Sequence, residues 1–545
     1  MTSFWDRRLL EDRIKISMAF MLAPCHLWSC SAFLPHSRIF YVNQLHSAVS
    51  RACFVRAAHL KPLLAFKPSP TVLQPRHHFS SLVDRYILHS KMAPQFKYSP
   101  SNLDHVEDLE KYWRGGFHPV HIGDKLDKVN TTTYRYEIIH KLGYGGFSTV
   151  WLANNLIEGG YFALKIVCAS QSSYGPAPSV KSILDSHPAR IFVTEIRRFA
   201  ISGPNGNHIC QVLPLTGPSL LSLSRVPYRL RPAACKILGR QAAQALAFLH
   251  KKGICHGDYT ASNLVLAVSP ALHRLTKPQL LQLLGTPVQD LVHPTGPKTT
   301  SAPKYVVQPA DLSKLGSSYL TETLMVVDFD QIFGFGKTLP SGVPRSPGFN
   351  LGTPLVYLAP EVIIEGAAGP GSDIWALGCT LFRMRAGMQL LTEWHSNMAS
   401  NVLEDIFDVV VGRPPSKWKR LQFRKNGWPA ASPRSGGDKA IDTLEFGQEA
   451  PDPEEDLKAK VCGIWDENRS RLGAALKPNE SPIFWKVDPN VVPHWGNVEG
   501  GFPHIPPAEA SQFLDLLMRT FDYDLKRRIT ADDILKHPWV AGVKR

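Results

Sequence analysis

The chain has 545 residues, of which 44% are hydrophobic and 20% are charged. This balance predicts a globular protein that is long enough for a two-lobed core and additional segments. The nine Cys residues include no C-x-x-C pair. Their spacing therefore argues against a zinc site and, at this length, against a disulfide framework, and it favours an intracellular protein with reduced thiols.

The net charge of +15 would suit a nucleic-acid-binding protein, but about half of the excess lies in one segment. Residues 14–83 contain no Asp or Glu, as in a mitochondrial transit peptide. A disordered extension, or translated sequence upstream of a true start at Met92, fits this composition too. We expect residues 1–95 to be such an N-terminal extension of a cytoplasmic or nuclear protein, with a mitochondrial location as the alternative. The apolar run of residues 16–34 is interrupted by Pro and His, so no membrane span is expected.

A glycine-rich turn between two predicted strands is the first motif with a chemical implication. Residues 134–140 alternate in polarity as a strand does. Glycines in the turn that follows let backbone N–H groups approach nucleotide phosphates closely. The residues expected to bind the nucleotide are Leu142, Gly143, Tyr144, Gly145, Gly146, Phe147, Ser148, Thr149 and Val150. Taken alone, the turn also fits an ordinary hairpin.

The apolar strand of residues 161–167 contains one cation, Lys165. A Lys inside such a strand is unfavourable unless it meets anions, and the phosphates of ATP would provide them. The alternative is a surface Lys whose stem follows the strand. Because the glycine-rich turn precedes it, we expect Lys165 to bind nucleotide and to be required for catalysis.

Residues 255–264 form a predicted loop between a helix at residues 233–250 and a short apolar strand. The loop contains Asp258 and Asn263, which lie five residues apart. In phosphoryl transfer, an Asp in such a loop orients the substrate hydroxyl and accepts its proton, and an Asn helps to hold a magnesium ion. The sequence therefore predicts a catalytic role for Asp258 and a metal-binding role for Asn263.

Residues 324–328 read as a buried strand that ends in an acid, Asp328. We expect Asp328 to bind Mg²⁺, and Asp330 adds a second carboxylate near the metal. A capping Asp at the end of a strand is the alternative reading. An insertion without strong periodicity, at about residues 269–320, separates this strand from the catalytic loop.

The loop at Asp258 resembles the H-R-D-x-x-x-x-N catalytic loop of protein kinases, and residues 328–330 resemble their D-F-G motif. Gly257 stands at the position of the usual Arg, Thr260 at that of the usual phosphate-binding Lys, and Asp330 at that of the Gly. Small-molecule phosphotransferases of the aminoglycoside and choline kinase type also carry an H-G-D…N loop. This loop alone therefore leaves both classes open.

Three later segments resemble those of protein kinases and have no counterpart in the small-molecule enzymes. They are the A-P-E motif at residues 359–361, the capped helix with D-I-W at residues 372–379, and the R-x-T-A…H-P-W ending at residues 528–539. By this resemblance, Asp373 is expected to bind backbone N–H groups of the catalytic loop, and Arg528 is expected to pair with Glu361.

Residues 112–124 read Y-W-R-G-G-F-H-P-V-H-I-G-D. They resemble the Y-x-x-G-G-Y-H-P-V-x-x-G-D segment that leads into the kinase domain of the SR-protein kinases, which phosphorylate Arg-Ser-rich splicing factors. The chain thus resembles a divergent, fungal-type member of that family. An active kinase also needs a helix Glu beside Lys165. We expect that helix within residues 179–186, which contain no Glu, and we expect Glu195 on a strand.

The resemblance implies an α+β, two-lobed eukaryotic protein kinase fold over residues 107–541. A small β-rich lobe is expected at about residues 134–215 and a mainly helical lobe at about 216–541, with a second insertion at 389–507. The implied protein is a general serine/threonine protein kinase that uses ATP and Mg²⁺. It is expected to be a monomer that acts on protein substrates, with Arg-Ser-rich proteins as the candidates that the resemblance implies, and without a membrane or direct nucleic-acid partner.

Two alternatives stay open. A catalytically impaired pseudokinase or scaffold is favoured by Thr260, by Asp330 and by the missing helix Glu, and a small-molecule phosphotransferase by the H-G-D loop. An acidic cluster in the second insertion could attract the Arg side chains of a substrate, or it could be a solvated loop. The cluster consists of Glu445, Glu449, Asp452, Glu454, Glu455 and Asp456.

Overall fold

The computed structural model describes the larger part of the chain. The described residues are 96–172, 178–297, 299–337, 339–341, 343–345, 351–391, 398–410, 414–436, 440–445, 456–467, 480–487 and 503–542. They all belong to one compact unit, Gln95–Arg545. The expected N-terminal extension, residues 1–95, lies outside the described residues.

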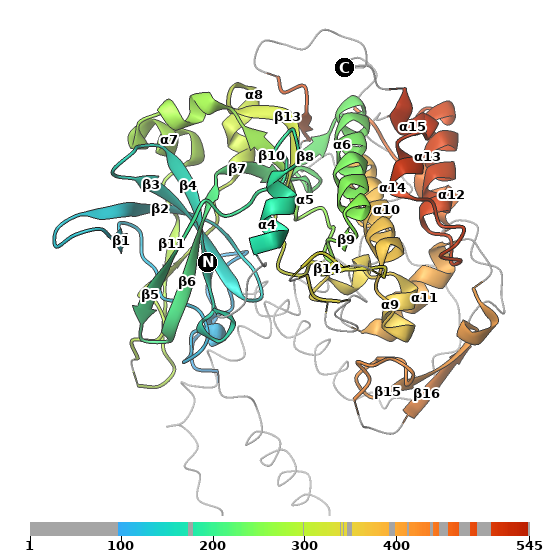
Figure 1. Ribbon diagram of the computed structural model, residues 1–545, viewed down its shortest axis with the longest axis horizontal. Coiled ribbons are helices and arrows are strands. Elements are labelled where there is room, and N and C mark those ends of the chain that lie inside the picture. The colour runs from blue at the N-terminus through green and yellow to red at the C-terminus, as the bar shows by residue number, and fades with distance from the viewer. Residues whose placement is uncertain are drawn as a thin grey trace, which may run out of the picture. The chain divides into compact units, whose positions relative to one another are not determined.

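A six-stranded antiparallel sheet forms the small lobe, in the order β1-β2-β3-β4-β6-β5 (Figure 1). Its strands are β1 (Lys125–Lys128), β2 (Tyr134–Tyr144), β3 (Ser148–Asn155), β4 (Tyr161–Val167), β5 (Arg197–Gly203) and β6 (Gly206–Pro214). Side chains on one face, among them Ile138, Leu164 and Val212, form a separate hydrophobic core. This arrangement follows from the alternation of residues along each strand.

The small lobe also contains the helix α4 (Pro178–Asp185), in which Val180 and Leu184 are fully buried. The helix contains no Glu, as the sequence predicts. The placement of Glu195 on a strand was wrong, because the pairing of β5 with β6 begins only at Arg197. Glu195 lies in the connection that precedes β5.

The large lobe is mainly helical and is built around α6 (Pro232–Lys251) and α10 (Pro370–Ala386). Other helices of this lobe are α5 (Leu220–Leu223), α9 (Pro360–Glu365), α11 (Ala399–Val409), α12 (Leu457–Cys462), α13 (Pro507–Thr520), α14 (Ala531–Ile534) and α15 (Pro538–Ala541). Its strands are β7 (Thr216–Ser219), β8 (Tyr228–Leu230), β9 (Ile254–Cys255), β10 (Leu264–Val268), β13 (Leu320–Val326), β14 (Phe333–Gly334), β15 (Arg420–Arg424), β16 (Ala440–Glu445) and β17 (Phe484–Lys486). None of the described helices combines the length and the hydropathy that a membrane span requires.

The insertion between the catalytic loop and Asp328 is structured and reaches the small lobe. It contains α7 (Lys277–Leu284), β11 (Gln289–Leu291), β12 (Tyr305–Val307) and α8 (Gly316–Tyr319). The Tyr305 hydroxyl accepts a hydrogen bond from the backbone N–H of Ile122 at 3.0 Å, and Val307 is buried in the small-lobe core. The Nζ of Lys277 lies 2.9 Å from Glu137 Oε1 on β2. The small lobe is therefore completed by residues that come after the catalytic loop, outside the predicted span 134–215.

The second insertion also contains regular structure in its described part, including α11, the β15–β16 hairpin and α12. Asp466, which follows α12, accepts two hydrogen bonds from the buried guanidinium of Arg385, at 2.5 and 2.9 Å. Two residues of the predicted acidic cluster are described. Glu445 lies 3.5 Å from Arg420, and Asp456 caps α12 by accepting from the N–H of Ala459. The other four cluster residues lie outside the described residues.

A buried ion pair joins the end of the A-P-E segment to the last part of the chain. Arg528 donates to Glu361 at 2.6 and 3.1 Å, and both side chains are at most 3% exposed. This confirms the pairing predicted from the sequence. The neighbouring Arg527 lies 3.2 Å from Asp522, but its side chain is 76% exposed.

We expect Arg528→Leu to lower the free energy of unfolding by about 3–5 kcal/mol, because Glu361 would be left buried without a counter-ion. Arg527→Leu is the matched control and should change it by less than about 1 kcal/mol, since an exposed pair contributes little. Urea unfolding of both variants measures the difference. Equal effects would contradict the assignment of Arg528 as the structural partner.

The pair His118 and His208 makes the small lobe sensitive to acid. Their rings meet edge to face, with centroids 4.8 Å apart. Burial, and then the proximity of His208, lower the pKa of His118 from 6.5 to about 4. The folded state thus keeps His118 neutral at a pH where the unfolded chain is protonated. Its contribution to stability is present above pH 6.5 and is lost as the pH falls toward 4.

We expect His118→Phe to reduce the loss of unfolding free energy between pH 6.5 and 4 by on the order of 3 kcal/mol, because the variant has no imidazole to protonate there. Urea unfolding of the wild type and the variant at pH 7.5, 5.5 and 4.5 measures the two slopes. Any packing effect of the substitution is already present at pH 7.5. Parallel pH profiles would show that His118 does not titrate on unfolding.

Candidate active site

A cavity of about 720 Å³ is bordered by the glycine-rich turn on one side and by the strand ends of the large lobe on the other. Six residues of the predicted turn line it: Leu142, Gly143, Tyr144, Gly145, Ser148 and Val150. Gly146, Phe147 and Thr149 are not among the lining residues; Phe147 points to solvent and Thr149 is buried behind the turn. Lys165, Asn263 and Asp328 also line the cavity.

Lys165 lies in the middle of β4 and contacts two carboxylates. Its Nζ is 2.8 Å from Asp328 Oδ1 and 2.8 Å from Asp330 Oδ2. Burial alone would lower the pKa of Lys165, but the charges of Asp328 and Asp330 outweigh burial and raise it above its ordinary value. Burial likewise opposes ionisation of Asp328, whose pKa is nevertheless lowered by Lys165. Lys165 therefore carries its charge directly beside the cavity.

Asp258 and Asn263 are hydrogen-bonded to each other at the catalytic loop. The Asn263 Nδ2 donates to the backbone carbonyl of Asp258 at 2.9 Å and to its Oδ2 at 2.8 Å. Burial raises the pKa of Asp258 above its usual value. Its Oδ1 is buried and accepts no hydrogen bond from the described residues. The nearby Thr353 hydroxyl donates instead to the carbonyl of Gly257 at 2.5 Å.

Asp328 is presented to the cavity by an unusual backbone conformation. Its φ of +64° lies in the left-handed region, which Asp tolerates better than most residues other than Gly. The next residue, Phe329, is buried, and its ring centroid lies 5.2 Å from that of His256 and 5.9 Å from that of Phe192. The packing of Phe329 fixes the direction in which Asp328 points. Sequence reasoning missed Phe192, which carries no motif of its own.

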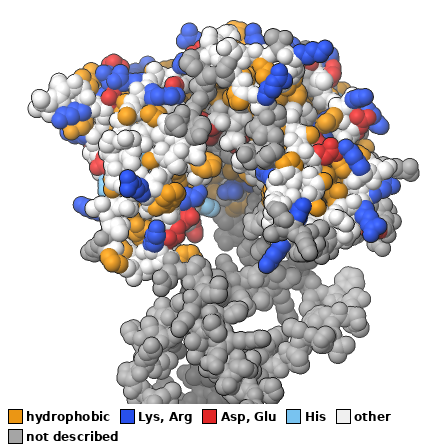
Figure 2. Space-filling model, turned by 60° about the horizontal axis from the view of Figure 1, so that its bottom comes forward, with side chains coloured by type: hydrophobic (Ala, Val, Ile, Leu, Met, Phe, Trp, Pro, Cys, Tyr) orange, Lys and Arg blue, Asp and Glu red, His pale blue; other side chains and the backbone are white. Residues whose placement is uncertain are grey.

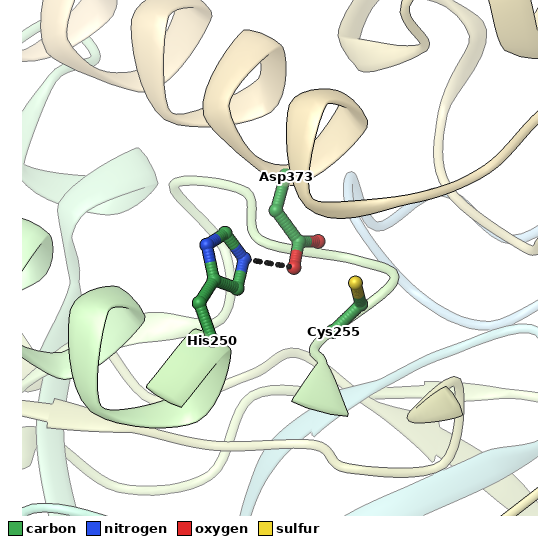
Figure 3. Close-up of side chains that lie close together, drawn as sticks. All are labelled: His250, Cys255 and Asp373. Atoms are coloured by element: carbon green, nitrogen blue, oxygen red, sulfur yellow. Dashed lines mark hydrogen bonds and ion pairs between the residues drawn. The ribbon is translucent and has the colours of Figure 1, made fainter. Parts of the chain in front are cut away.

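Asp373, at the start of α10, holds the backbone of the catalytic loop. Its two carboxylate oxygens accept hydrogen bonds from the N–H groups of His256, at 2.9 Å, and Gly257, at 3.0 Å. This confirms the role that the sequence predicts for Asp373. His250 and Cys255 adjoin the same carboxylate (Figure 3), with His250 Nε2 at 3.1 Å from Asp373 Oδ2.

The three side chains of this cluster could in principle hold a metal ion, since their ligand atoms lie within 4.8 Å of one another. Both oxygens of Asp373 already accept backbone N–H groups, however. Burial, together with Asp373, raises the pKa of the Cys255 thiol, so the thiol stays protonated. These features describe a hydrogen-bonded cluster that orders the loop, and a metal would have to displace those bonds.

Comparison with known proteins shows which proteins this chain resembles. The model of the protein kinase domain matches residues 321–540. SRSF protein kinase 3 from Homo sapiens is 34% identical over 227 residues, which cover 39% of this chain and 38% of the relative. Serine/threonine-protein kinase SRPK from Physarum polycephalum is 29% identical over 460 residues, which cover 80% of this chain and 92% of the relative. The chain thus contains a protein kinase domain and is similar to the SR-protein kinases.

The matches differ in how much of each chain they cover. A solved structure described as a kinase domain is 15% identical, with a TM-score of 0.43, and covers 78% of this chain and 98% of that chain. The chain spans about a third of the length of the first curated relatives that it matches. The two-lobed protein kinase fold expected from the sequence is confirmed. A protein kinase domain in general uses ATP and a divalent metal ion.

The structure gives a physical reason for Gly257, where protein kinases usually have Arg. Gly257 has a φ of +80°, and a Cβ at this position would lie 2.3 Å from the backbone carbonyl oxygen of Gln331. The loop can therefore approach the segment after Asp330 only with Gly. The sequence contained no signal for this contact, because Gln331 belongs to no motif.

Thr260, at the position of the usual Lys, does not reach into the cavity. It is fully buried, and its Oγ1 lies 3.0 Å from the hydroxyl of Ser262. Ser262, which is exposed, lines the cavity instead. This chain thus has a neutral residue where the catalytic loop of protein kinases usually supplies a phosphate-binding cation.

We expect Asp373→Asn to loosen the catalytic loop, because an amide NH₂ would face one of the two backbone donors. The loss of a hydrogen bond to a charged group costs about 1–3 kcal/mol. Hydrogen exchange at His256 and Gly257 should become roughly 10- to 100-fold faster, as measured by mass spectrometry of peptides that span the loop. Cys255→Ala keeps both backbone bonds and is the control, and equally fast exchange in both variants would contradict the role of Asp373.

Proposed function

We propose that the chain is an ATP- and Mg²⁺-dependent serine/threonine protein kinase of the general class, whose substrates include Arg-Ser-rich proteins. The observation that carries the proposal is the meeting of Lys165, Asp258, Asn263 and Asp328 at one cavity beneath a glycine-rich turn. Three of the four line the cavity, and Asp258 is joined to them through Asn263. Each side chain has a type and a partner that suit phosphoryl transfer.

The residues present fit a nucleotide with a divalent ion. Asn263 donates through Nδ2, so its Oδ1 can serve as a ligand beside the carboxylate of Asp328. Oxygen ligands of this kind are the ones that Mg²⁺ prefers. A bound ion would neutralise charge that develops on the phosphates. Lys165 would contact the phosphates, and the accessible backbone of Gly143 and Gly145 would cover them.

The carboxylate of Asp258 would accept a hydrogen bond from the substrate hydroxyl. Its Oδ1 is an acceptor without a partner among the described residues, while Oδ2 is fixed by Asn263. A serine or threonine hydroxyl that donates to Oδ1 would be oriented for attack and would lose its proton to this carboxylate. Because burial raises the pKa of Asp258, the carboxylate is a stronger base than an exposed Asp. The contribution of these residues is positioning and charge stabilisation.

The substrate proposal rests on similarity to the SR-protein kinases and on charge. The names of the relatives SRSF protein kinase 3 and SRPK point to SR-type protein substrates for those proteins. On the face drawn in Figure 2, a group of acidic side chains lies near the recess between the two lobes, whereas the described Lys and Arg side chains are scattered. Acidic groups beside the cleft would favour the approach of Arg-rich segments. We propose the cytoplasm or nucleus as the place of action, and the free thiols of the described cysteines support a reducing compartment.

A scaffold with a kinase fold is the second candidate, and the buried, neutral Thr260 favours it. The absence of a cation there removes one contact to the transferred phosphate, worth on the order of 2–3 kcal/mol. Such a loss would slow phosphate transfer, but the other residues that suit phosphoryl transfer would still be in place. The two candidates differ in whether phosphate is transferred to a protein at all.

We expect the wild-type chain to transfer labelled phosphate from ATP to an Arg-Ser repeat peptide. Asp258→Asn should lower kcat at least about 100-fold, because the hydroxyl loses its base, and Lys165→Met should abolish most of the transfer. A Lys-Ser peptide of equal length is the control for Arg recognition. ATP binding without transfer by the wild type would favour the scaffold, and transfer that persists in Asp258→Asn would refute the assigned chemistry.

A further inference from the structure

The partner of Lys165 is the feature of this site that the kinase pattern does not explain. Lys165 is 8% exposed, and a buried ammonium requires a counter-charge. In protein kinases that counter-charge is a Glu on the helix of the small lobe. Here two carboxylates from a single segment contact the Nζ, each at 2.8 Å, and these belong to Asp328 and Asp330.

The acidic residues nearest in sequence to the helix α4 pair with residues other than Lys165. Asp185, the acid of α4, lies 2.5 Å from Lys181 Nζ, and its Oδ1 accepts from the Thr194 hydroxyl at 2.6 Å. Glu195 lines the same cavity, but its Oε2 accepts from Arg198 at 2.8 and 2.9 Å. Among the residues described in this part of the small lobe, none presents a carboxylate to Lys165.

The two carboxylates at Lys165 differ in the other groups that they contact or are proposed to bind. Asp328, with Asn263, is the residue proposed to hold the metal ion, so an ion there would compete with Lys165 for the same oxygens. Among the described residues, the side chain of Asp330 is bonded to Lys165 alone. Asp330 stands where protein kinases have Gly, which offers no side chain. A second carboxylate would keep Lys165 in place when the first one is engaged.

We propose that Asp330 is the positioning residue for Lys165 and takes the place of the helix Glu that this chain lacks. The proposal rests on the proposed use of ATP, because its purpose is to hold the Lys165 ammonium where phosphates bind. According to this proposal, the position of Lys165 depends on residues 328–330 and not on α4. The missing helix Glu then does not by itself make this chain a pseudokinase.

The ion pair can be tested without nucleotide, by the rate at which acetic anhydride acylates Lys165 in the folded chain, read by peptide mass spectrometry. We expect at least threefold faster acylation in Asp330→Asn, since Asp328 is then the one described carboxylate left to hold the ammonium in its buried position. Asp330→Glu should stay close to the wild type. Asp185→Asn, which removes the acid of α4, is the matched control and should also leave the rate unchanged. An unchanged rate in Asp330→Asn, or an increase in Asp185→Asn, would overturn the proposal.

A double-mutant cycle on ADP binding then tests whether Asp330 acts through Lys165. We expect Asp330→Asn and Lys165→Met each to raise the Kd of ADP with Mg²⁺ about tenfold, and the double variant to bind no more weakly than Lys165→Met. If the effects of the two substitutions on the free energy of ADP binding are fully additive, Asp330 acts as a metal ligand and the proposal is overturned. The proposal is also overturned if Asp330→Asn binds ADP as tightly as the wild type or more tightly, because Asp330 then has no positioning role. Asp330→Gly, which restores the kinase pattern, replaces Asp330→Asn if thermal melting shows that the latter is unfolded.

ADP binding by the wild type tests the proposed function separately from the role of Asp330. If the wild type binds no ADP with or without Mg²⁺, the use of ATP is refuted, while the acylation rates still decide whether Asp330 holds Lys165.

Discussion

The carboxylate of Asp373 holds the catalytic loop in the shape on which the other site residues depend. It fixes two consecutive backbone N–H groups, those of His256 and Gly257, and so sets the direction of Asp258. Asn263 then closes the loop onto Asp258, and its carbonyl accepts from the N–H of Val327, next to Asp328. One buried charge at a helix start thereby orders groups that lie more than a hundred residues apart in the sequence.

The sequence predicted the parts of the site that lie within short motifs of fixed spacing. Asp258 and Asn263 share one loop, so their spacing alone places them together, and the apolar strand around Lys165 indicated a buried cation. The pairing of Arg528 with Glu361 and the role of Asp373 followed from the resemblance, and the structure shows both contacts. Six of the nine residues predicted in the glycine-rich turn line the cavity.

The remaining features depend on contacts between distant segments, which no local pattern contains. Gly257 is required by a carbonyl at Gln331, and Phe329 is held by Phe192 from the connection after α4. Glu195 was placed on a strand because its surroundings resemble a hairpin, yet the ladder begins two residues later. The insertion after the catalytic loop lacked periodicity because its elements are short. Strands β11 and β12 pair with each other, and Tyr305 and Val307 of β12 contact the small lobe.

That insertion changes how the two lobes can move. In a protein whose lobes are joined by one connecting strand, the cleft opens by rotation about that strand. Here a second covalent path leaves the large lobe at β10, contributes Tyr305 and Val307 to the small lobe, and returns at β13. Rotation of the lobes must strain or break these contacts, so opening of the cleft carries a free-energy cost that is set by packing far from the cavity.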